Sequence, residues 1–507
     1  MIKELKIKML RMYAAGAAKK TGREAKDIEN DIIIAKRRLN VGYGTYVTKQ
    51  LYRKTYAEIK AEFGAKDKSR KKDMDVELVA EMKGISYEEA KKEMDELKAK
   101  HDILYKEYTQ NKLYIYKTRK GLKKKLDRIA EKNEKYLKEV CDDAGWTYEK
   151  AKSEAARIKK LYGLTYKQYS RYRFYAMTDE EIAAKLRHWQ DNTNHYIETV
   201  MAESGWSRDK VRRHMKRYGV LYDILQPYYV LYRGWELSDE EMDSYARQKN
   251  SETLWARYND AEQARILAEK HRFDEVYAEY TGRKFWINRD SSFEEFKEFA
   301  EGLNYIFCKP IESGGGLGTE KHKVTEDLRG LYDLLMGKER LLVEECIEQH
   351  PEVDEFIPGC CCTVRVVVLE DEEGTHTICA GMRFGHDGIT DNFSQDGMVA
   401  DIDIETGVIV TDAVDKKGHV YAQHPLSGKT FKGFKVPNWD KVREVTTKAM
   451  DVLPGINYVG WDVAICENKA VLVEGNAMPD LVLIQAPYAP VKKGMKYLFD
   501  PWLNKDK

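Results

Sequence analysis

The sequence predicts two joined modules: an all-α array of helical repeats over residues 1–240 and an α+β domain over residues 250–507. The charge changes sign along the chain. Residues 1–250 hold 56 Lys and Arg against 40 Asp and Glu, whereas residues 251–507 hold 30 against 45. The first proline is Pro227, and after it short apolar runs alternate with Gly and Pro, which is typical of strands and turns. We therefore expect a multidomain protein with different chemistry in each half.

Four segments of the first module resemble one another at a spacing of about 60 residues. Three of them have a glycine, one further residue, a Ser or Thr, and then acidic residues, the pattern of a helix end followed by a capped helix start. Repeats of this length predict stacked helical units that bury a shared core. The repeat glycines are Gly22, Gly84, Gly145 and Gly205, and the expected N-caps are Ser86, Thr147 and Ser207.

Tyrosines recur three residues apart in the first three repeats, so each pair shares one helical face. One interpretation is that they form the core between repeats. A second is a basic aromatic groove for an acidic polymer such as nucleic acid, an anionic glycan or an acidic peptide. A third is docking against an acidic partner, including this chain's own C-terminal half; no motif predicts sequence-specific nucleic-acid binding. The pairs are Tyr43/Tyr46, Tyr105/Tyr108 and Tyr166/Tyr169.

The cysteine pattern and the apolar runs indicate in which cellular compartment the protein works. None of the eight cysteines forms a CxxC pair or a zinc-ligand spacing, so we expect buried, reduced thiols. The basic N-terminal segment lacks the apolar stretch of a signal peptide, and no apolar run approaches the roughly 18 residues of a membrane-spanning helix. We expect a cytoplasmic protein without a membrane span.

The first strand of interest in the second half is 305–310, a short apolar run that includes Lys309. A glycine-rich loop follows it. Glycines let backbone N–H groups close on phosphate oxygens, and a nearby lysine adds positive charge, although an ordinary turn has the same composition. The loop residues with this expected role are Ser313, Gly314, Gly315, Gly316 and Gly318.

Charged residues then interrupt three further apolar runs. The run 340–347 breaks at two acids, and the runs 363–368 and 379–384 each contain one arginine, Arg365 and Arg383. A buried arginine needs a partner, which is either a phosphate or a structural carboxylate. The sequence leaves both open.

A hairpin near the end of the chain places oxygen ligands together. Tyr458–Ala464 and Ala470–Asn476 read as two strands joined by a turn at 467–469. Glu474 and Asn476 point to one face because side chains alternate along a strand, and Asp462 lies on the partner strand. Hard oxygen ligands converging on one face are those that Mg²⁺ takes, while a plain polar strand end is the alternative.

The order of these features resembles the ATP-grasp superfamily over about residues 251–490. The runs LVEECIEQHPEV, RFGHDGITDNFSQDGMVADIDIETG, HPLSG and LPGINYVGWDVAICENKAVLVEGNAMP are similar to the sugar-transfer-associated ATP-grasp family, which is named for its place in surface-polysaccharide gene clusters. The resemblance implies an ATP-grasp fold in which ATP and Mg²⁺ lie between two α+β lobes.

The resemblance also implies roles for individual residues. Lys309 would contact the α- and β-phosphates under the glycine loop, and Arg365 and Arg383 would steady the γ-phosphate and an acyl-phosphate; these three form the expected catalytic set. Glu348 or Glu352 would bind the ribose. The adenine hinge would be Glu344, Glu345, Cys346 and Ile347, and the Mg²⁺ ligands Asp462, Glu474 and Asn476.

The activity that these roles imply is ATP-dependent carboxylate–amine ligation through an acyl-phosphate, in surface-polysaccharide or peptide and amino-acid conjugate biosynthesis. The partners expected are a small-molecule, glycan or peptide carboxylate, an amine, and an acidic polymer on the basic array. The loop 385–398, with His386, Asp387, Asp391 and Asn392, is the candidate substrate lid, or else a solvated loop. The alternatives are a kinase that phosphorylates a hydroxyl and a non-catalytic, nucleotide-regulated helical scaffold.

Overall fold

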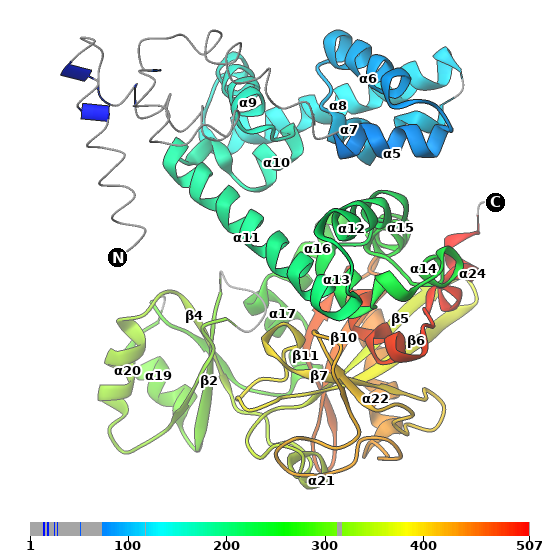
Figure 1. Ribbon diagram of the computed structural model, residues 1–507. Helices are drawn as coiled ribbons and strands as arrows, with labels where there is room; N and C mark the ends of the chain where they lie inside the picture. The colour runs from blue at the N-terminus through cyan, green and yellow to red at the C-terminus, as the bar shows by residue number, and fades with distance from the viewer. Residues whose placement is uncertain are drawn as a thin grey trace. The chain divides into compact units, whose positions relative to one another are not determined.

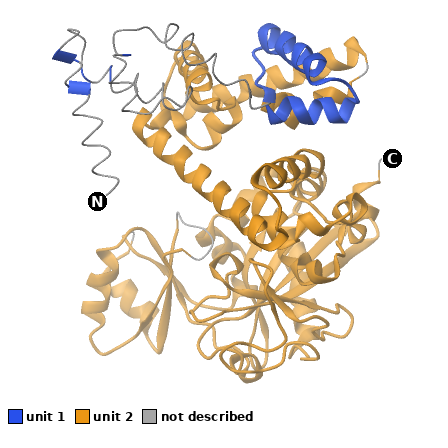
Figure 2. Cartoon of the chain, in the orientation of Figure 1, with its two compact units in different colours: residues 1–105 blue, residues 106–507 orange. Residues whose placement is uncertain are grey.

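The computed structural model describes residues 73–505 except 117, 290 and 312–316, together with a few isolated earlier positions. The chain divides into two compact units, residues 1–105 and 106–507 (Figure 2). The first repeat, with Gly22 and Tyr43/Tyr46, and the loop residues Ser313–Gly316 lie outside the described residues. Within the described ranges, no helix combines the length and apolar character that crossing a membrane requires.

The N-terminal region is helical, as predicted, and its helices recur in one order (Figure 1). Each of the three described repeats has a 15-residue helix, a 6-residue helix and a short 3-10 turn, and in two of them a 26-residue helix comes first. The elements are α5 (Met74–Lys83), α6 (Tyr87–His101), α7 (Tyr105–Gln110), η2 (Leu113–Ile115), α8 (Arg119–Ala144), α9 (Tyr148–Tyr162), α10 (Tyr166–Arg171), η3 (Phe174–Ala176), α11 (Asp179–Ser204), α12 (Arg208–Tyr222), α13 (Gln226–Leu231) and η4 (Gly234–Glu236).

The expected caps explain where the 15-residue helices begin. The side chains of Ser86, Thr147 and Ser207 each accept a hydrogen bond from the backbone N–H three residues later. Such a cap satisfies one of the orphan donors of the first helical turn and stabilises a helix by about 1 kcal/mol. The glycines that precede these caps adopt left-handed φ, for instance +64° at Gly84 and +70° at Gly205, so the preceding helix ends there.

One tyrosine of each short helix is a core residue. Tyr108, Tyr169 and Tyr229 hold equivalent positions on the three short helices and are each 1% exposed. These rings are too buried to stack on a ligand, whereas Tyr105 and Tyr166, the first members of their pairs, are half-buried, so the aromatic groove stays a prediction. Polar contacts inside unit 2 join successive repeats: Lys106 Nζ donates to Gln168 Oε1 at 2.9 Å.

The α+β region contains two antiparallel sheets. The small sheet, in the order β1-β4-β2-β3, is covered by α19 and α20 through a core that includes Trp286, Phe296 and Leu335. The predicted strand 305–310 is β2. The elements are β1 (Phe285–Ile287), α19 (Phe293–Ala300), β2 (Tyr305–Pro310), β3 (Glu320–Lys323), α20 (Leu328–Met336) and β4 (Leu341–Glu345).

The large sheet has the order β11-β10-β5-β6-β7-β8-β9. One face packs on α16, α17 and α22 around Trp461 and Phe356, and the other packs on α15, α23 and α24 around Tyr458 and Leu481. The strands are β5 (Thr363–Asp371), β6 (Gly374–Phe384), β7 (Met398–Ile402), β8 (Ala413–Asp415), β9 (Val420–Tyr421), β10 (Tyr458–Ile465) and β11 (Ala470–Asn476). The helices are α14 (Asp239–Asp243), α15 (Gln248–Tyr258), α16 (Ala261–Ala268), α17 (Lys270–Val276), α18 (Ala278–Thr281), α21 (Pro351–Asp354), α22 (Trp439–Lys448), α23 (Leu481–Gln485) and α24 (Asp500–Leu503).

The last repeat packs directly on the large sheet. Leu231 and Trp235 share a core with Val399 of β7, Val414 of β8 and Val482 of α23. The hydroxyl of Tyr228 also donates to Asp480 at 3.1 Å. The array and the α+β region are therefore continuous in unit 2 (Figure 1).

Candidate functional site

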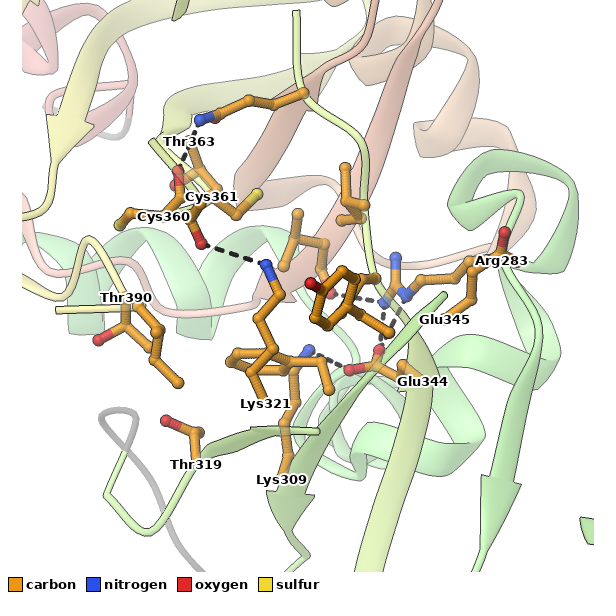
Figure 3. Close-up of a pocket in the computed structure, with 18 of the residues that line it drawn as sticks. Arg283, Lys309, Thr319, Lys321, Glu344, Glu345, Cys360, Cys361, Thr363 and Thr390 are labelled. Carbon is orange, nitrogen blue, oxygen red and sulfur yellow. Dashed lines mark hydrogen bonds and ion pairs between the residues drawn. The ribbon is translucent and has the colours of Figure 1, made fainter. Parts of the chain in front are cut away.

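A pocket of about 520 Å³ lies between the two sheets, within the 300–1,000 Å³ range of small-molecule sites. β2, β3 and β4 of the small sheet line one side, and β5, β6, β10 and β11 line the other. The link after β4 crosses between them, since His350 N–H donates to the carbonyl of Ile465 at the end of β10 at 2.7 Å. The pocket is thus open to side chains from both lobes (Figure 3).

Lys309 enters the pocket from β2 and is held by Glu344 of β4. The Lys309 Nζ atom lies 2.5 Å from Glu344 Oε2. The other carboxylate oxygen of Glu344 accepts from Arg283 Nε at 2.8 Å (Figure 3). Glu344 is almost fully buried, and an unpaired buried carboxylate is costly, so these two cations are what permit its position.

Arg283 connects this group to the large sheet. Its guanidinium donates to Asp274 of α17 at 2.7 Å, to the carbonyl of Leu472 at 2.6 Å and to that of Val473 at 3.2 Å. Burial raises the pKa of Asp274 to about 7, with a further rise from the charge of Glu344. Burial acts in the same direction on Glu344, but the charges of Arg283 and Lys309 outweigh it and lower its pKa. At neutral pH Glu344 is therefore the fully ionised member of the pair.

A bulge in β11 aims Glu474 at the pocket. Asp462 lies on the strand that pairs with β11, as the sequence predicts, and its partner there is Glu474, but the next residue of β10, Val463, pairs with Leu472. Val473 is thus the extra residue of β11, and Arg283 binds the carbonyls of Leu472 and Val473. Bulges re-aim side chains at functional sites, and this one is fixed by a buried arginine.

Two arginines converge on Asp462. Arg365 Nη2 donates to Asp462 Oδ2 at 3.1 Å, and Arg383 Nη2 donates to the same oxygen at 2.8 Å. Burial alone would raise the pKa of Asp462, but the two guanidinium charges outweigh it and hold that pKa well below its usual range. Both arginines thus pair with a carboxylate, and Arg383 also lies on the pocket wall.

Asp391 and Thr363 orient Arg383 from the other side. Asp391 Oδ2 accepts from the backbone N–H of Thr363 at 2.7 Å and from its hydroxyl at 2.6 Å. The Thr363 hydroxyl oxygen in turn accepts from Arg383 Nη2 at 2.6 Å. Arg383 is therefore clamped between Asp462 and the Thr363–Asp391 pair, with its guanidinium on the pocket wall.

The charge of this cluster fits a divalent cation. Asp462, Glu474 and Asp391 carry three negative charges against two on the arginines, and Glu474 forms no ion pair with a described residue. Desolvation within the pocket and the neighbouring Asp462 raise the pKa of Glu474, although its side chain keeps contact with solvent, and a bound cation would reverse that shift. Carboxylate oxygens suit Mg²⁺. Among the residues described, no cluster of three or more His, Cys, Asp or Glu is arranged to hold a metal.

The pocket gathers most of the predicted site residues. Those on its wall are Lys309, Glu344, Glu345, Cys346, Ile347, Glu348, Arg383, Asp391, Asn392, Asp462 and Glu474. The described residues Gly318, Glu352, Arg365, His386 and Asn476 are not among those lining it. Asn476 instead donates to Glu474 at 3.3 Å and to the carbonyl of Gly460 at 3.4 Å.

Sequence reasoning missed three residues of the site. Arg283 lies in a short polar run before β1, and its partners come from distant segments. Lys321 of β3 reaches the pocket over the ring of Tyr305, with Nζ 5.0 Å from the ring centroid, yet its segment EKHK reads as a solvated edge strand. Thr363 reads as an ordinary strand residue. All eight cysteines are free thiols, and five of them are buried, whereas Cys141, Cys346 and Cys361 are half-buried.

Comparison with known proteins agrees with this geometry. Residues 317–496 match the family described as sugar-transfer associated ATP-grasp. Within the C-terminal half, residues 317–496 thus carry the match to a sugar-transfer associated ATP-grasp domain. The sequence-based resemblance is confirmed for that half of the chain, and the all-α region followed by an α+β ATP-grasp fold is confirmed as its architecture. No curated protein matches the sequence.

Several solved structures show weak similarity to this chain. The ATP-grasp ligase PsnB complexed with a minimal precursor is 13% identical over 46% of this chain and 62% of its own, with a TM-score of 0.28. D-alanyl-alanine synthetase A from Vibrio cholerae O1 biovar eltor is 11% identical over 48% and 66%, with a TM-score of 0.31. The chain thus spans about three-fifths of the length of the PsnB structure. Similarity at this level says nothing about the substrate.

Proposed function

We propose that the protein is an ATP-dependent carboxylate–amine ligase that forms an amide through an acyl-phosphate. The observation that carries the proposal is the pocket itself, in which Lys309 of one lobe faces Arg383, Asp462 and Glu474 of the other, in a domain of the sugar-transfer associated ATP-grasp family. A triphosphate needs cations on both sides, and this pocket supplies them from two sheets.

The reaction has two steps. A carboxylate oxygen of the acid attacks the γ-phosphorus of ATP, and the bond from that phosphorus to the bridging oxygen of ADP breaks. The amine nitrogen then attacks the acyl carbon, phosphate leaves, and the nitrogen loses a proton. Little covalent help is needed, so positioning and charge stabilisation carry the rate.

The residues of the pocket divide this work. Lys309 binds phosphate oxygens, for which it must exchange the carboxylate of Glu344. Arg383, fixed by Asp462 and Asp391, faces the charge that develops on the transferred phosphoryl group. Glu474 would hold Mg²⁺ together with Asp462, which must exchange an arginine contact for the ion, and Mg²⁺ supplies positive charge to the phosphate oxygens when bound. The backbone at the end of β4 and just after it, from Glu345 to Ile347, lines the pocket and would contact the adenine.

A hydroxylamine trap tests the proposal. The full chain is mixed with Mg-ATP, hydroxylamine and a set of uronates, amino acids and peptides, and hydroxamates and ADP are scored by mass. Hydroxylamine converts an acyl-phosphate into a hydroxamate, whose mass identifies the acid that was activated. We expect an acid-dependent hydroxamate that Glu474→Gln abolishes and that an exposed control, Glu444→Gln, retains.

Other outcomes of the hydroxylamine trap would support one of the two alternative functions. ADP with a phosphorylated product and no hydroxamate would replace the ligase by a kinase. Nucleotide binding without any ADP across the whole set would favour the regulated scaffold.

A further inference from the structure

Two carboxylates behind the pocket share a single arginine nitrogen. Arg283 Nη2 lies 2.7 Å from Asp274 Oδ1 and 2.7 Å from Glu344 Oε1. Two carboxylate oxygens that bind the same atom are close neighbours, and their charges repel each other. Both side chains are almost fully buried, so water does little to screen that repulsion. The pair is therefore a place where a proton can be taken up or released.

The second carboxylate oxygen of Asp274 lacks a donor. Asp274 Oδ2 is buried and accepts no hydrogen bond from any residue that the structure describes. The carboxylate beside it, that of Glu344, is also an acceptor. A buried acceptor without a donor is costly, whereas a proton on Oδ2 would let Asp274 donate to Glu344. Burial and the charge of Glu344 raise the pKa of Asp274 to about 7, in agreement with this geometry.

Three charges face Asp274, namely Glu344, Arg283 and Lys309. Lys309 acts through Glu344, since its Nζ atom lies 2.5 Å from Glu344 Oε2. Helices α16 and α18 and strand β11 also pack against α17. Their charged side chains are exposed, and those of α17 itself are at least half-exposed apart from Asp274. These other groups are Glu262, Arg265, Lys270, His271, Arg272, Glu275, Glu279 and Glu474.

We propose that nucleotide binding loads a proton onto Asp274 and so allows Lys309 to move from Glu344 to a phosphate. In the free protein two cations face the two carboxylates. Once Lys309 binds phosphate, Arg283 alone remains, and the pair keeps an uncompensated buried charge unless it takes up a proton from solvent. The new O–H bond forms on Asp274 Oδ2, which then donates to Glu344.

Asp274 is thus a positioning residue, because it acts on the nucleotide through Glu344 and Lys309 and does not line the pocket. The inference rests on the proposed function in one respect, which is that Lys309 binds a nucleotide phosphate. It does not depend on which acid or amine the enzyme uses.

The test is a calorimetric titration of ADP into the full chain at pH 8, in two buffers with different enthalpies of ionisation. The difference between the two apparent enthalpies gives the number of protons taken up. ADP has the α- and β-phosphates that Lys309 is expected to contact, and it is not turned over. Mg²⁺ is present in both solutions throughout.

The test variant is Asp274→Asn, which places a neutral group of the same size beside Glu344. The matched control is Asp401→Asn. Burial raises the pKa of Asp401 to about 7 as well, but this residue is buried beside Tyr488 and does not line the pocket. Thermal unfolding confirms that each variant folds.

We expect wild type and Asp401→Asn to take up about half a proton per ADP more than Asp274→Asn does. A complex that holds more protons than the free protein binds more weakly as pH rises. The Kd of wild type should therefore increase about fivefold from pH 7 to pH 9, and that of Asp274→Asn less than twofold. Equal proton uptake by wild type and Asp274→Asn, or an equal pH dependence of their Kd values, would overturn the proposal.

Lys309→Met provides a second test that does not require Asp274→Asn to fold. Its two carboxylates already lack the second cation before ADP arrives, so the residual ADP binding should take up less than half as many protons as wild type. Uptake equal to that of wild type would overturn the proposal.

The outcome is separable from that of the ligase proposal. Proton uptake without any hydroxamate would remove the ligase alone, and a hydroxamate without proton uptake would remove the role of Asp274 alone. No binding of ADP at all would overturn both.

Discussion

Replacing Arg283 by methionine would test how the two lobes are joined behind the pocket. The side chain is 5% exposed and contacts Glu344, Asp274 and two carbonyls of the β11 bulge. Removing one member of a buried ion pair costs about 3–5 kcal/mol, and each orphaned carbonyl about 1–3 kcal/mol. Asp274 can take up a proton, which limits the loss. We therefore predict a loss of about 4 kcal/mol in the free energy of unfolding.

Differential scanning calorimetry measures this loss. In a region of this size 1 kcal/mol shifts Tm by about 2–4 °C, so Arg283→Met should lower it by roughly 10 °C. The matched control is Arg272→Met, whose side chain is 45% exposed and pairs with Glu269 at 3.6 Å; we expect about 0.5 kcal/mol or less. If Arg283→Met unfolds at the same temperature as Arg272→Met, the joining role of Arg283 is refuted.

Substitutions of Asp391 and Asp401 test two further features, the orientation of Arg383 and the pH dependence of stability. Asp391→Asn should lower kcat by about tenfold and leave the KM for ATP nearly unchanged, because Arg383 is misaligned rather than removed. Steady-state kinetics measures both constants. An unchanged kcat would contradict the role of Asp391 in orienting Arg383. Asp401 is buried beside Tyr488, and burial raises its pKa to about 7. The unfolded carboxyl ionises near pH 4, so wild-type stability falls as pH rises from 4 to 7. Asp401→Asn should remove that slope and gain up to about 4 kcal/mol at pH 8 relative to pH 4. If the Tm values of Asp401→Asn and wild type change equally with pH across this range, Asp401 is not the source of the pH dependence.

The parts of the fold that local pattern decides were predictable. The strands at 305–310 and 470–476 occur at the predicted residues, and the turn at 467–469 fixes the hairpin register from Ile465 opposite Ala470 to Val463 opposite Leu472. The caps at Ser86, Thr147 and Ser207 are equally local.

The parts that long-range pairing decides were not predictable. Arg365 meets Asp462, 97 residues away in sequence, because β5 and β10 are neighbours in the sheet, and no local pattern gives that pairing. The contact of Arg283 with the β11 bulge has the same origin. A bulge follows from one extra residue in a ladder, so it becomes visible only when both strands are in register.

The most direct test of the site is a calorimetric titration of ATP into the full chain with and without Mg²⁺. Lys309→Met should weaken binding under both conditions, by about 2 kcal/mol, because it removes a phosphate contact. Glu474→Gln should weaken binding with Mg²⁺ present and leave metal-free binding unchanged. Equal binding by Lys309→Met and wild type, or a metal-independent effect of Glu474→Gln, would contradict the placement of the nucleotide between the two sheets.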